Sequence, residues 1–132
     1  MLEIRNLDVS FAAKSKRRRA LVRAVNGVSL TLEKGDSLGL VGESGSGKTT
    51  VGRAVLGLNH VSSGQIIFDG DDITKLSGSV EKKFRSRAQM VFQDPHSALN
   101  PRMTILRSVA EPLVLHTRLR GAALREKVGE LL

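Results

Sequence analysis

Two glycines, a lysine and a threonine stand at a spacing that suits phosphate binding. The segment Gly42-Glu43-Ser44-Gly45-Ser46-Gly47-Lys48-Thr49 fits the pattern G-x-x-x-x-G-K-[ST]. Glycines adopt backbone angles that a Cβ forbids, so successive amides can point inward at phosphate oxygens. Lys48 offers a mobile positive charge for β- and γ-phosphates, and the Thr49 hydroxyl is a hard oxygen ligand for Mg²⁺. These residues, here called the phosphate loop, predict a nucleoside triphosphate site with magnesium, in which Thr50 would hydrogen-bond the α-phosphate.

The sequence on either side of the phosphate loop has the periodicity that such a loop needs. Ser37–Val41 is a short apolar run, typical of a strand buried on both faces. Lys48–Leu58 carries Val51, Val55 and Leu58 on one face, which predicts a helix. The positive end of that helix would add to the attraction for phosphate. The alternative is a Gly/Ser turn that merely joins strand to helix, and the strand–loop–helix context favours the phosphate site.

The rest of the chain contains both strand and helix patterns, as an α/β fold does. Two dipeptides mark turns: Asn26-Gly27 suggests a hairpin turn or a bulge, and Asp69-Gly70 suggests a tight turn. The expected strands are Glu3–Phe11, Leu21–Leu32, Gln65–Phe68 and Ala88–Phe92, and the expected helices are Ser79–Arg87, Ile105–Leu115 and Ala122–Leu132.

Size and composition limit the class of protein. The 132 residues suit one modest domain, and aromatic residues make up only 3%, so an aliphatic core is expected. The chain has no cysteine, which excludes disulfides and thiolate metal sites. No apolar run approaches the roughly 20 residues of a membrane span, so a cytoplasmic protein is expected. Five of the cations lie in residues 14–19; no aromatic side chains interleave with them, which favours a solvated loop and makes nucleic-acid binding unlikely.

A second block of sequence narrows the class. Met90-Val91-Phe92-Gln93-Asp94-Pro95, continuing through Leu99-Asn100-Pro101-Arg102-Met103-Thr104, resembles the Q-loop region of ABC transporter ATP-binding subunits, most of all those of peptide and nickel importers. Four further segments resemble the same family in its order and spacing: Val25–Leu30, Gly39–Thr50, Ser63–Ile66 and Asp69-Gly70. The resemblance covers nearly the whole chain.

The resemblance implies a fold and a function. The fold would be a P-loop NTPase core of the ABC ATPase type with an antiparallel β subdomain. Residues 1–132 would be the N-terminal part of one ATP-binding domain, ending before the signature and Walker B segments. The function would be ATP binding and energy coupling in an importer of peptides or nickel, with ATP hydrolysis in the complete protein. The alternative is a non-catalytic nucleotide-binding fragment or a regulatory module.

The resemblance also implies residue roles. Phe11 would stack on adenine, and a core Phe at a strand end is the equal alternative. Gln93 would approach the magnesium or the attacking water. The residues implied in catalysis are then Lys48 and Gln93, and those implied in contacting Mg²⁺ are Thr49 and Gln93. The segment from Pro95 to Met103 would face the transmembrane permease subunits. A second ATP-binding subunit would complete a dimer. Through the permease partners the protein, itself cytoplasmic, would lie at the inner face of the plasma membrane.

Three elements that the family needs for hydrolysis would lie beyond Gln93: a signature segment, an acidic pair and a switch histidine. Leu76-Ser77-Gly78-Ser79-Val80 looks like a signature but precedes Gln93. The carboxylates of Asp69, Asp71 and Asp72 suit a solvated turn, and the histidines at positions 60, 96 and 116 show no ligand spacing. We therefore expect the isolated chain to hydrolyse ATP negligibly and to associate through an open strand edge.

Overall fold

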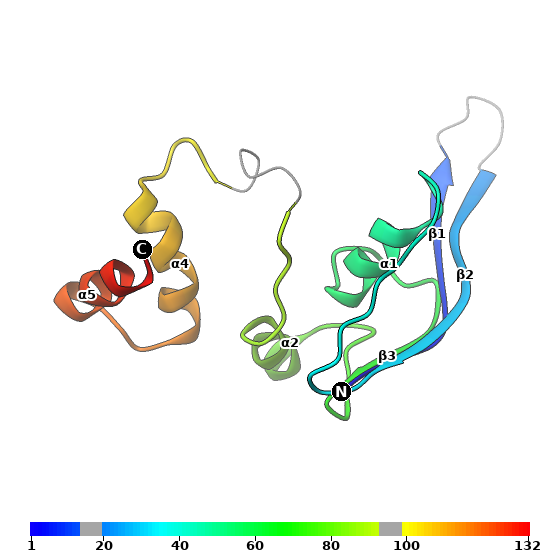
Figure 1. Ribbon diagram of the computed structural model, residues 1–132, viewed down its shortest axis with the longest axis horizontal. Helices are drawn as coiled ribbons and strands as arrows, with labels where there is room; N and C mark the ends of the chain where they lie inside the picture. Colours follow the sequence, from blue (N-terminus) through cyan, green and yellow to red (C-terminus); the bar gives the residue numbers. More distant parts are fainter. Residues whose placement is uncertain (14–19, 93–98) are drawn as a thin grey trace. The chain divides into compact units, whose positions relative to one another are not determined.

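The computed structural model describes residues 1–13, 20–92 and 99–132. They form two compact units, Met1–Phe84 and Arg85–Leu132. In chain order, the helices and strands are β1 (Leu2–Ala13), β2 (Ala20–Leu32), α1 (Lys48–Val55), β3 (Ser63–Phe68), β4 (Asp71–Asp72), α2 (Gly78–Arg85), α4 (Ile105–His116) and α5 (Gly121–Leu131) (Figure 1). All except β4, for which the sequence suggested only a turn, lie where the sequence predicted an element of that type.

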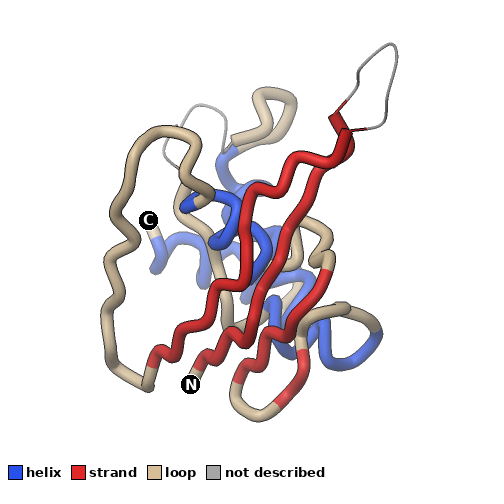
Figure 2. Tube along the Cα trace, turned by 90° about the vertical axis from the view of Figure 1, so that its right-hand side faces the viewer, coloured by secondary structure: helices blue, strands red, loops and turns tan. Residues whose placement is uncertain are grey.

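The first unit is built on an antiparallel sheet in the order β2-β1-β3-β4. Figure 2 shows β1 and β2 as two long strands running side by side, with the shorter β3 on the other side of β1. This sheet is the antiparallel β subdomain that the family resemblance implied.

The β1–β2 ladder is interrupted by bulges. Leu7 pairs with Val28 and Val9 pairs with Val25, so Asp8 alone on β1 faces two residues of β2, Asn26 and Gly27. Of the two alternatives for Asn26-Gly27, a hairpin turn and a bulge, the structure therefore shows the bulge.

A further irregularity on β1 keeps its apolar residues on one face. Asn6 has a left-handed backbone with φ 46°, and the register shifts there. Ile4, Leu7 and Val9 are consequently all buried, although Leu7 comes three positions after Ile4 and Val9 two positions after Leu7. In a regular strand Ile4 and Leu7 would point to opposite faces. The extra residue between them brings both side chains to the same, buried face.

The core of the first unit is mostly aliphatic, as expected, with Phe84 as its buried aromatic residue among those described. Ile66 of β3 is fully buried, and α1 covers the sheet with Val51 and Ala54. Phe68 and Phe84 meet edge to face with ring centroids 5.2 Å apart. Burial of this one apolar face is what fixes α1 against β1 and β2 (Figure 1).

The turn predicted at Asp69-Gly70 is confirmed, whereas the predicted end of the first helix is not. Asp69 and Gly70 have φ of 48° and 86° and join Phe68 to Asp71 as a two-residue hairpin turn. Helix α1 ends at Val55, earlier than the predicted Leu58, because Gly57 takes a left-handed φ of 67°.

Two predicted strands were wrong. Residues 37–41 and 88–92 lie in no strand. Val41 is 97% exposed and Val91 is 98% exposed, so neither run is buried. An apolar run of this kind is stable as a strand only between neighbours that cover both of its faces and edges. The described residues offer these two segments no such neighbours.

The second unit contains helices α4 and α5. The Thr104 hydroxyl accepts a hydrogen bond from the Arg107 amide at 3.3 Å and so caps the start of α4. Ala110 of α4 and Val128 of α5 are buried in this unit. Of the helices in the described part of the chain, none combines the length and the apolar character needed to cross a membrane.

Candidate phosphate-binding site

The phosphate loop closes around the ammonium group of Lys48. Nζ of Lys48 donates to the carbonyl oxygens of Gly42 and Glu43, both at 2.6 Å, and to the Ser46 hydroxyl at 3.1 Å. The Ser46 amide donates to the Glu43 carbonyl at 3.2 Å, which tightens the turn. The loop thus surrounds the Lys48 ammonium group, which could exchange these loop oxygens for those of a bound anion.

Two glycines of the loop have backbone angles and close neighbours that a side chain would disturb. Gly47 has φ 95° and Gly42 has φ 158°. A Cβ on Gly47 would lie 2.4 Å from the carbonyl oxygen of Ala24, and one on Gly42 would lie 2.8 Å from the Ser46 hydroxyl oxygen. Gly47 therefore allows the start of α1 to approach β2 closely.

The start of α1 adds partial positive charge to this loop. Lys48 is the first helical residue, and the Val51 amide is the first to bond within the helix, to Gly47 at 2.9 Å. The preceding amides at the helix start are the donors that anions use at such positions. The hydroxyl-bearing Thr49 is exposed and Thr50 is half-buried, both in this first turn.

A hollow of about 400 Å³ opens beside the loop. Its walls come from β2, the segment before the loop, and the start of α1: Arg23, Ala24, Val25, Asn26, Val28, Leu40, Val41, Ser46, Gly47, Lys48 and Val51. Among these described lining residues, arginine and lysine are the charged types and none is acidic. The hollow therefore suits an anion.

The hollow includes one cation that the sequence did not single out. Arg23 lies in β2 with its guanidinium Nη1 donating to the Asn26 side chain at 3.0 Å. No local motif marks Arg23, because its place in the hollow depends on β2 packing under a loop more than twenty residues away in sequence.

Other predicted site residues are not brought together by the described structure. Phe11 is 43% exposed near the end of β1 and pairs with Val22, so it is not a core residue. It does not line the hollow beside Lys48. Gln93 lies outside the described residues, as does the part of the Pro95–Met103 segment from residue 95 to 98.

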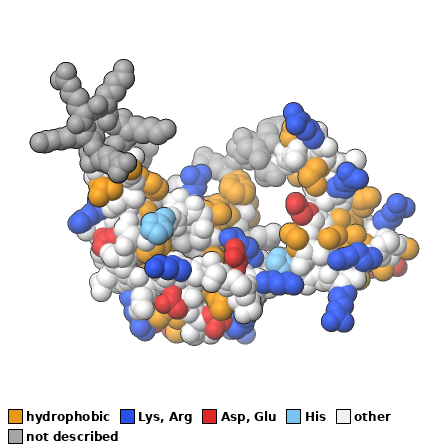
Figure 3. Space-filling view, turned by 180° about the vertical axis from the view of Figure 1, so that it is seen from behind, with side chains coloured by type: hydrophobic (Ala, Val, Ile, Leu, Met, Phe, Trp, Pro, Cys, Tyr) orange, Lys and Arg blue, Asp and Glu red, His pale blue; other side chains and the backbone are white. Residues whose placement is uncertain are grey.

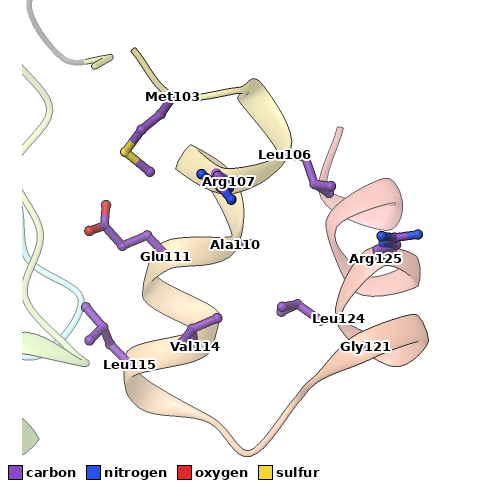
Figure 4. A pocket seen from close by; sticks show the side chains of 10 residues that line it. All are labelled: Met103, Leu106, Arg107, Ala110, Glu111, Val114, Leu115, Gly121, Leu124 and Arg125. Atoms are coloured by element: carbon purple, nitrogen blue, oxygen red, sulfur yellow. The ribbon is translucent and has the colours of Figure 1, made fainter. Parts of the chain in front are cut away.

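The second unit has a hollow of its own, of about 490 Å³, between α4 and α5. Figure 4 shows Leu106 and Val114 of α4 on the side turned to α5, with Leu124 of α5 pointing back at them. Met103, at the end of the predicted permease-facing segment, also lines this groove. Arg107, Glu111 and Arg125 add charge at the groove, and Figure 3 shows Lys and Arg interleaved with apolar side chains on this unit.

A glycine-rich loop that encloses a lysine, leads into a helix and rests on a sheet defines a P-loop nucleotide-binding protein. A family model described as ABC transporter matches residues 25–131. The chain therefore belongs to the ABC transporter family.

Curated relatives agree with this family. The chain is 46% identical to the dipeptide transport ATP-binding protein DppF of Lactococcus lactis subsp. cremoris, and 43% identical to the oligopeptide transport ATP-binding protein OppF of Streptococcus mutans. Each match spans 100% of this chain and 42% of the relative. The chain thus spans less than half the length of these relatives.

Solved structures support the fold. The dimeric structure of the bacterial ABC transporter cassette MJ0796 matches with a TM-score of 0.80 at 23% identity. The post-hydrolysis state of the same cassette, bound to ADP and Pi, matches with a TM-score of 0.78 at 24% identity. Each match covers 98% of this chain and 55% of the solved chain. The fold is that of an ABC ATPase cassette.

Proposed function

We propose that this chain binds ATP as part of the energy-coupling subunit of an ABC importer that takes up peptides or nickel. The observation that carries the proposal is the curled phosphate loop, with Lys48 held 2.6 Å from the Gly42 and Glu43 carbonyl oxygens at the start of α1. The names of the curated relatives, which are dipeptide and oligopeptide transport ATP-binding proteins, favour peptides over nickel.

The residues of the loop fit a phosphate chain. The Lys48 ammonium would exchange its carbonyl partners for β- and γ-phosphate oxygens, which accept charge-assisted hydrogen bonds. Amides of residues 43–50 would complete the cradle, with Ser44, Gly45 and Ser46 at its turn. Arg23 adds a second positive charge at the wall of the same hollow. Phe11, exposed near the end of β1, is proposed to stack on the base.

Magnesium would be held through oxygen ligands, which the Thr49 hydroxyl and the Gln93 amide can supply. Such an ion would neutralise charge on the phosphates. Thr49 is exposed in the first turn of α1, so its hydroxyl is accessible for this role. In the complete protein, Lys48 and Gln93 are proposed to serve hydrolysis by holding the γ-phosphoryl group and orienting the attacking water.

One observation favours a narrower role for this chain taken alone. No carboxylate is found among the described residues that line the hollow, so none of them can accept a proton from an attacking water. We propose that the isolated chain binds nucleotide without turning it over. Residues 1–132 would then form one part of an ATP-binding domain, as the family resemblance implies.

The partners follow from the same proposal. Transmembrane permease subunits would contact the Pro95–Met103 segment, and the apolar groove that Met103 shares with α4 and α5 supports a protein contact in that region. A second ATP-binding subunit would complete the nucleotide site, as the dimer seen for the solved cassette suggests. The protein would then lie in the cytoplasm, peripheral to the inner face of the plasma membrane.

ATP titration with a matched pair of lysine variants tests the proposal. Lys48→Ala removes the charge from the loop, whereas Lys34→Ala removes an exposed turn lysine of the same unit. We expect K48A to weaken calorimetrically measured binding of ATP with magnesium by roughly 10- to 100-fold, the range for lost charged hydrogen bonds. K34A should bind as the parent does. Equal binding by K48A and the parent would refute the proposed ATP site. Measurable ATP turnover by the pure parent chain, abolished in K48A, would refute the proposal that the isolated chain does not hydrolyse ATP.

A further inference from the structure

Asp8 ties three strands of the sheet together with one carboxylate. Its Oδ1 accepts from the Gly27 amide of β2 at 2.9 Å, and its Oδ2 accepts from the Ser63 hydroxyl of β3 at 2.6 Å. Its backbone carbonyl accepts from the Ser62 amide at 2.9 Å. Asp8 therefore links β1 to both of its neighbours at the same level of the sheet.

This link lies where the backbone ladders are irregular on both sides of β1. The β1–β2 register shifts between Leu7 and Val9, and the β1–β3 register shifts between Arg5 and Asp8. A bulge leaves backbone groups without their regular partners. The carboxylate supplies an acceptor to the Gly27 amide at that point, so a side chain replaces a missing ladder contact.

The part of β2 held by Asp8 is the part that supports the phosphate loop. Val25 pairs with Val9 while Arg23 pairs with Ser10, so Ala24 is an extra residue between them. The Ala24 carbonyl and the Val25 side chain lie against Gly47: a Cβ there would come within 2.4 Å and 3.6 Å of them. The stretch from Ala24 to Gly27 is four residues, and its ends are about 10 Å apart, which is short enough for a shift at one end to reach the other.

The loop has little other support from the sheet. Residues 37–41, which lead into it, form no strand and are exposed. On its other side, Val51 and Ala54 of α1 are buried, and α1 packs on β1 and β2. Within the described residues, β2 is thus the strand that Gly47 contacts at the start of α1.

We propose that Asp8 is a positioning residue of the phosphate loop: by fixing Gly27 it sets the place of the Ala24 carbonyl under Gly47. Asp8 itself touches neither the loop nor the hollow. The inference rests on the proposed binding of ATP and adds a residue outside the phosphate-loop motif to the same site. It predicts that a change in β1 alters nucleotide affinity through β2.

The decisive experiment compares two aspartates of the same sheet. Asp8→Ala removes the link, whereas Asp72→Ala removes a carboxylate that accepts from the Thr74 amide at 2.8 Å, in β4, which pairs with β3 and not with β2. We expect D8A to weaken binding of ATP with magnesium by roughly tenfold, as small misplacement of a binding group does, and D72A to stay within about twofold. Equal losses in D8A and D72A, measured in the full chain, would overturn the proposal.

Three further measurements separate positioning from general destabilisation. Asp8→Asn retains an acceptor for the Gly27 amide and should restore most of the affinity. Amide chemical shifts of Gly45, Gly47 and Lys48 in the nucleotide-free chain should move in D8A and stay in place in D72A. If D8A does not fold, Ser63→Ala, which cuts one arm of the carboxylate, should weaken binding about threefold; unchanged affinity in S63A would then overturn the proposal.

The outcome also distinguishes this inference from the proposed function. If the parent chain fails to bind ATP, the proposed function fails. If the parent binds, K48A loses binding, and D8A binds as D72A does, only the role of Asp8 fails.

Discussion

Gly47 lies against the carbonyl of Ala24 so closely that a Cβ on the glycine would come within 2.4 Å of that oxygen. The contact joins the last glycine of the phosphate loop to the bulged part of β2. The two backbones are in close contact here, so a shift of this part of β2 toward the loop would displace Gly47.

Gly47→Ala and Gly45→Ala should differ although both glycines have left-handed angles, φ 95° and φ 81°. Around Gly45 a Cβ meets nothing within 4 Å, so G45A carries only the backbone strain, about 1 kcal/mol. G47A adds the clash with Ala24 and should lose about 2–4 kcal/mol in the free energy of unfolding. Urea denaturation measures both values, and equal losses in the two variants would show that the Ala24 contact carries no energy.

Arg23→Ala should weaken ATP binding although no sequence motif includes Arg23. The side chain lines the hollow beside Lys48, so its charge acts on the same anion. For a partly solvated charge we expect a loss of about three- to fivefold at low salt, shrinking as salt screens the pair. Arg53→Ala, in the last turn of α1 and outside the hollow, is the control. Calorimetry at two salt concentrations measures the ATP affinity of both variants. An equal loss of affinity in R53A would show that the position of Arg23 in the hollow does not matter.

The stability of the first unit should depend on pH through Asp8. The Ser63 hydroxyl and then the Gly27 amide hold the pKa of this carboxyl below its usual value, with a smaller contribution from the charge of Arg23 and a small opposing effect of burial. A carboxyl whose pKa is lower in the folded state stabilises that state above its unfolded pKa, near 4. This stabilisation is lost as the pH falls through the folded pKa.

Asp8→Asn should therefore flatten the acid limb of the stability profile. Denaturation midpoints of the parent and D8N, measured from pH 6 down through the folded pKa of Asp8, should converge at the acid end of that range. Other carboxyls titrate in both proteins, so the difference between the two profiles isolates Asp8. Parallel profiles would show that Asp8 does not titrate with folding.

Val91→Asp should reduce association of the chain. Val91 is 98% exposed in an apolar run that has no strand partner among the described residues, so it is an open site for self-contact. A charge at this position opposes association and removes no core contact, so we expect an unchanged free energy of unfolding. Val51→Asp is the contrasting variant, because Val51 is buried and its replacement should unfold the first unit. Sedimentation velocity measures association, and V91D sedimenting as the parent does would contradict the prediction.

Much of the fold followed from local pattern. Helix α1 was predicted because residues spaced three and four apart share a face, and its packing on the sheet with Val51 buried agrees with that. The Asp69-Gly70 turn was predicted because both residues tolerate left-handed angles. The strands predicted at 37–41 and 88–92 were wrong because a strand depends on neighbours that are distant in sequence. Their apolar residues indicate what a strand would bury, and a strand forms only where neighbouring strands are present to bury it.

The sequence by itself determined the phosphate loop, because the loop depends on residue types at fixed short spacings: glycines at 42 and 47 and the lysine that follows. The tertiary structure alone decided how that loop is supported. Asp8 bonds to residues 19 and 55 positions away, and Arg23 reaches the hollow only because β2 lies under Gly47. Such contacts arise from strand pairing over long separations, and no spacing along the chain encodes which bulge places a carboxylate opposite a given amide.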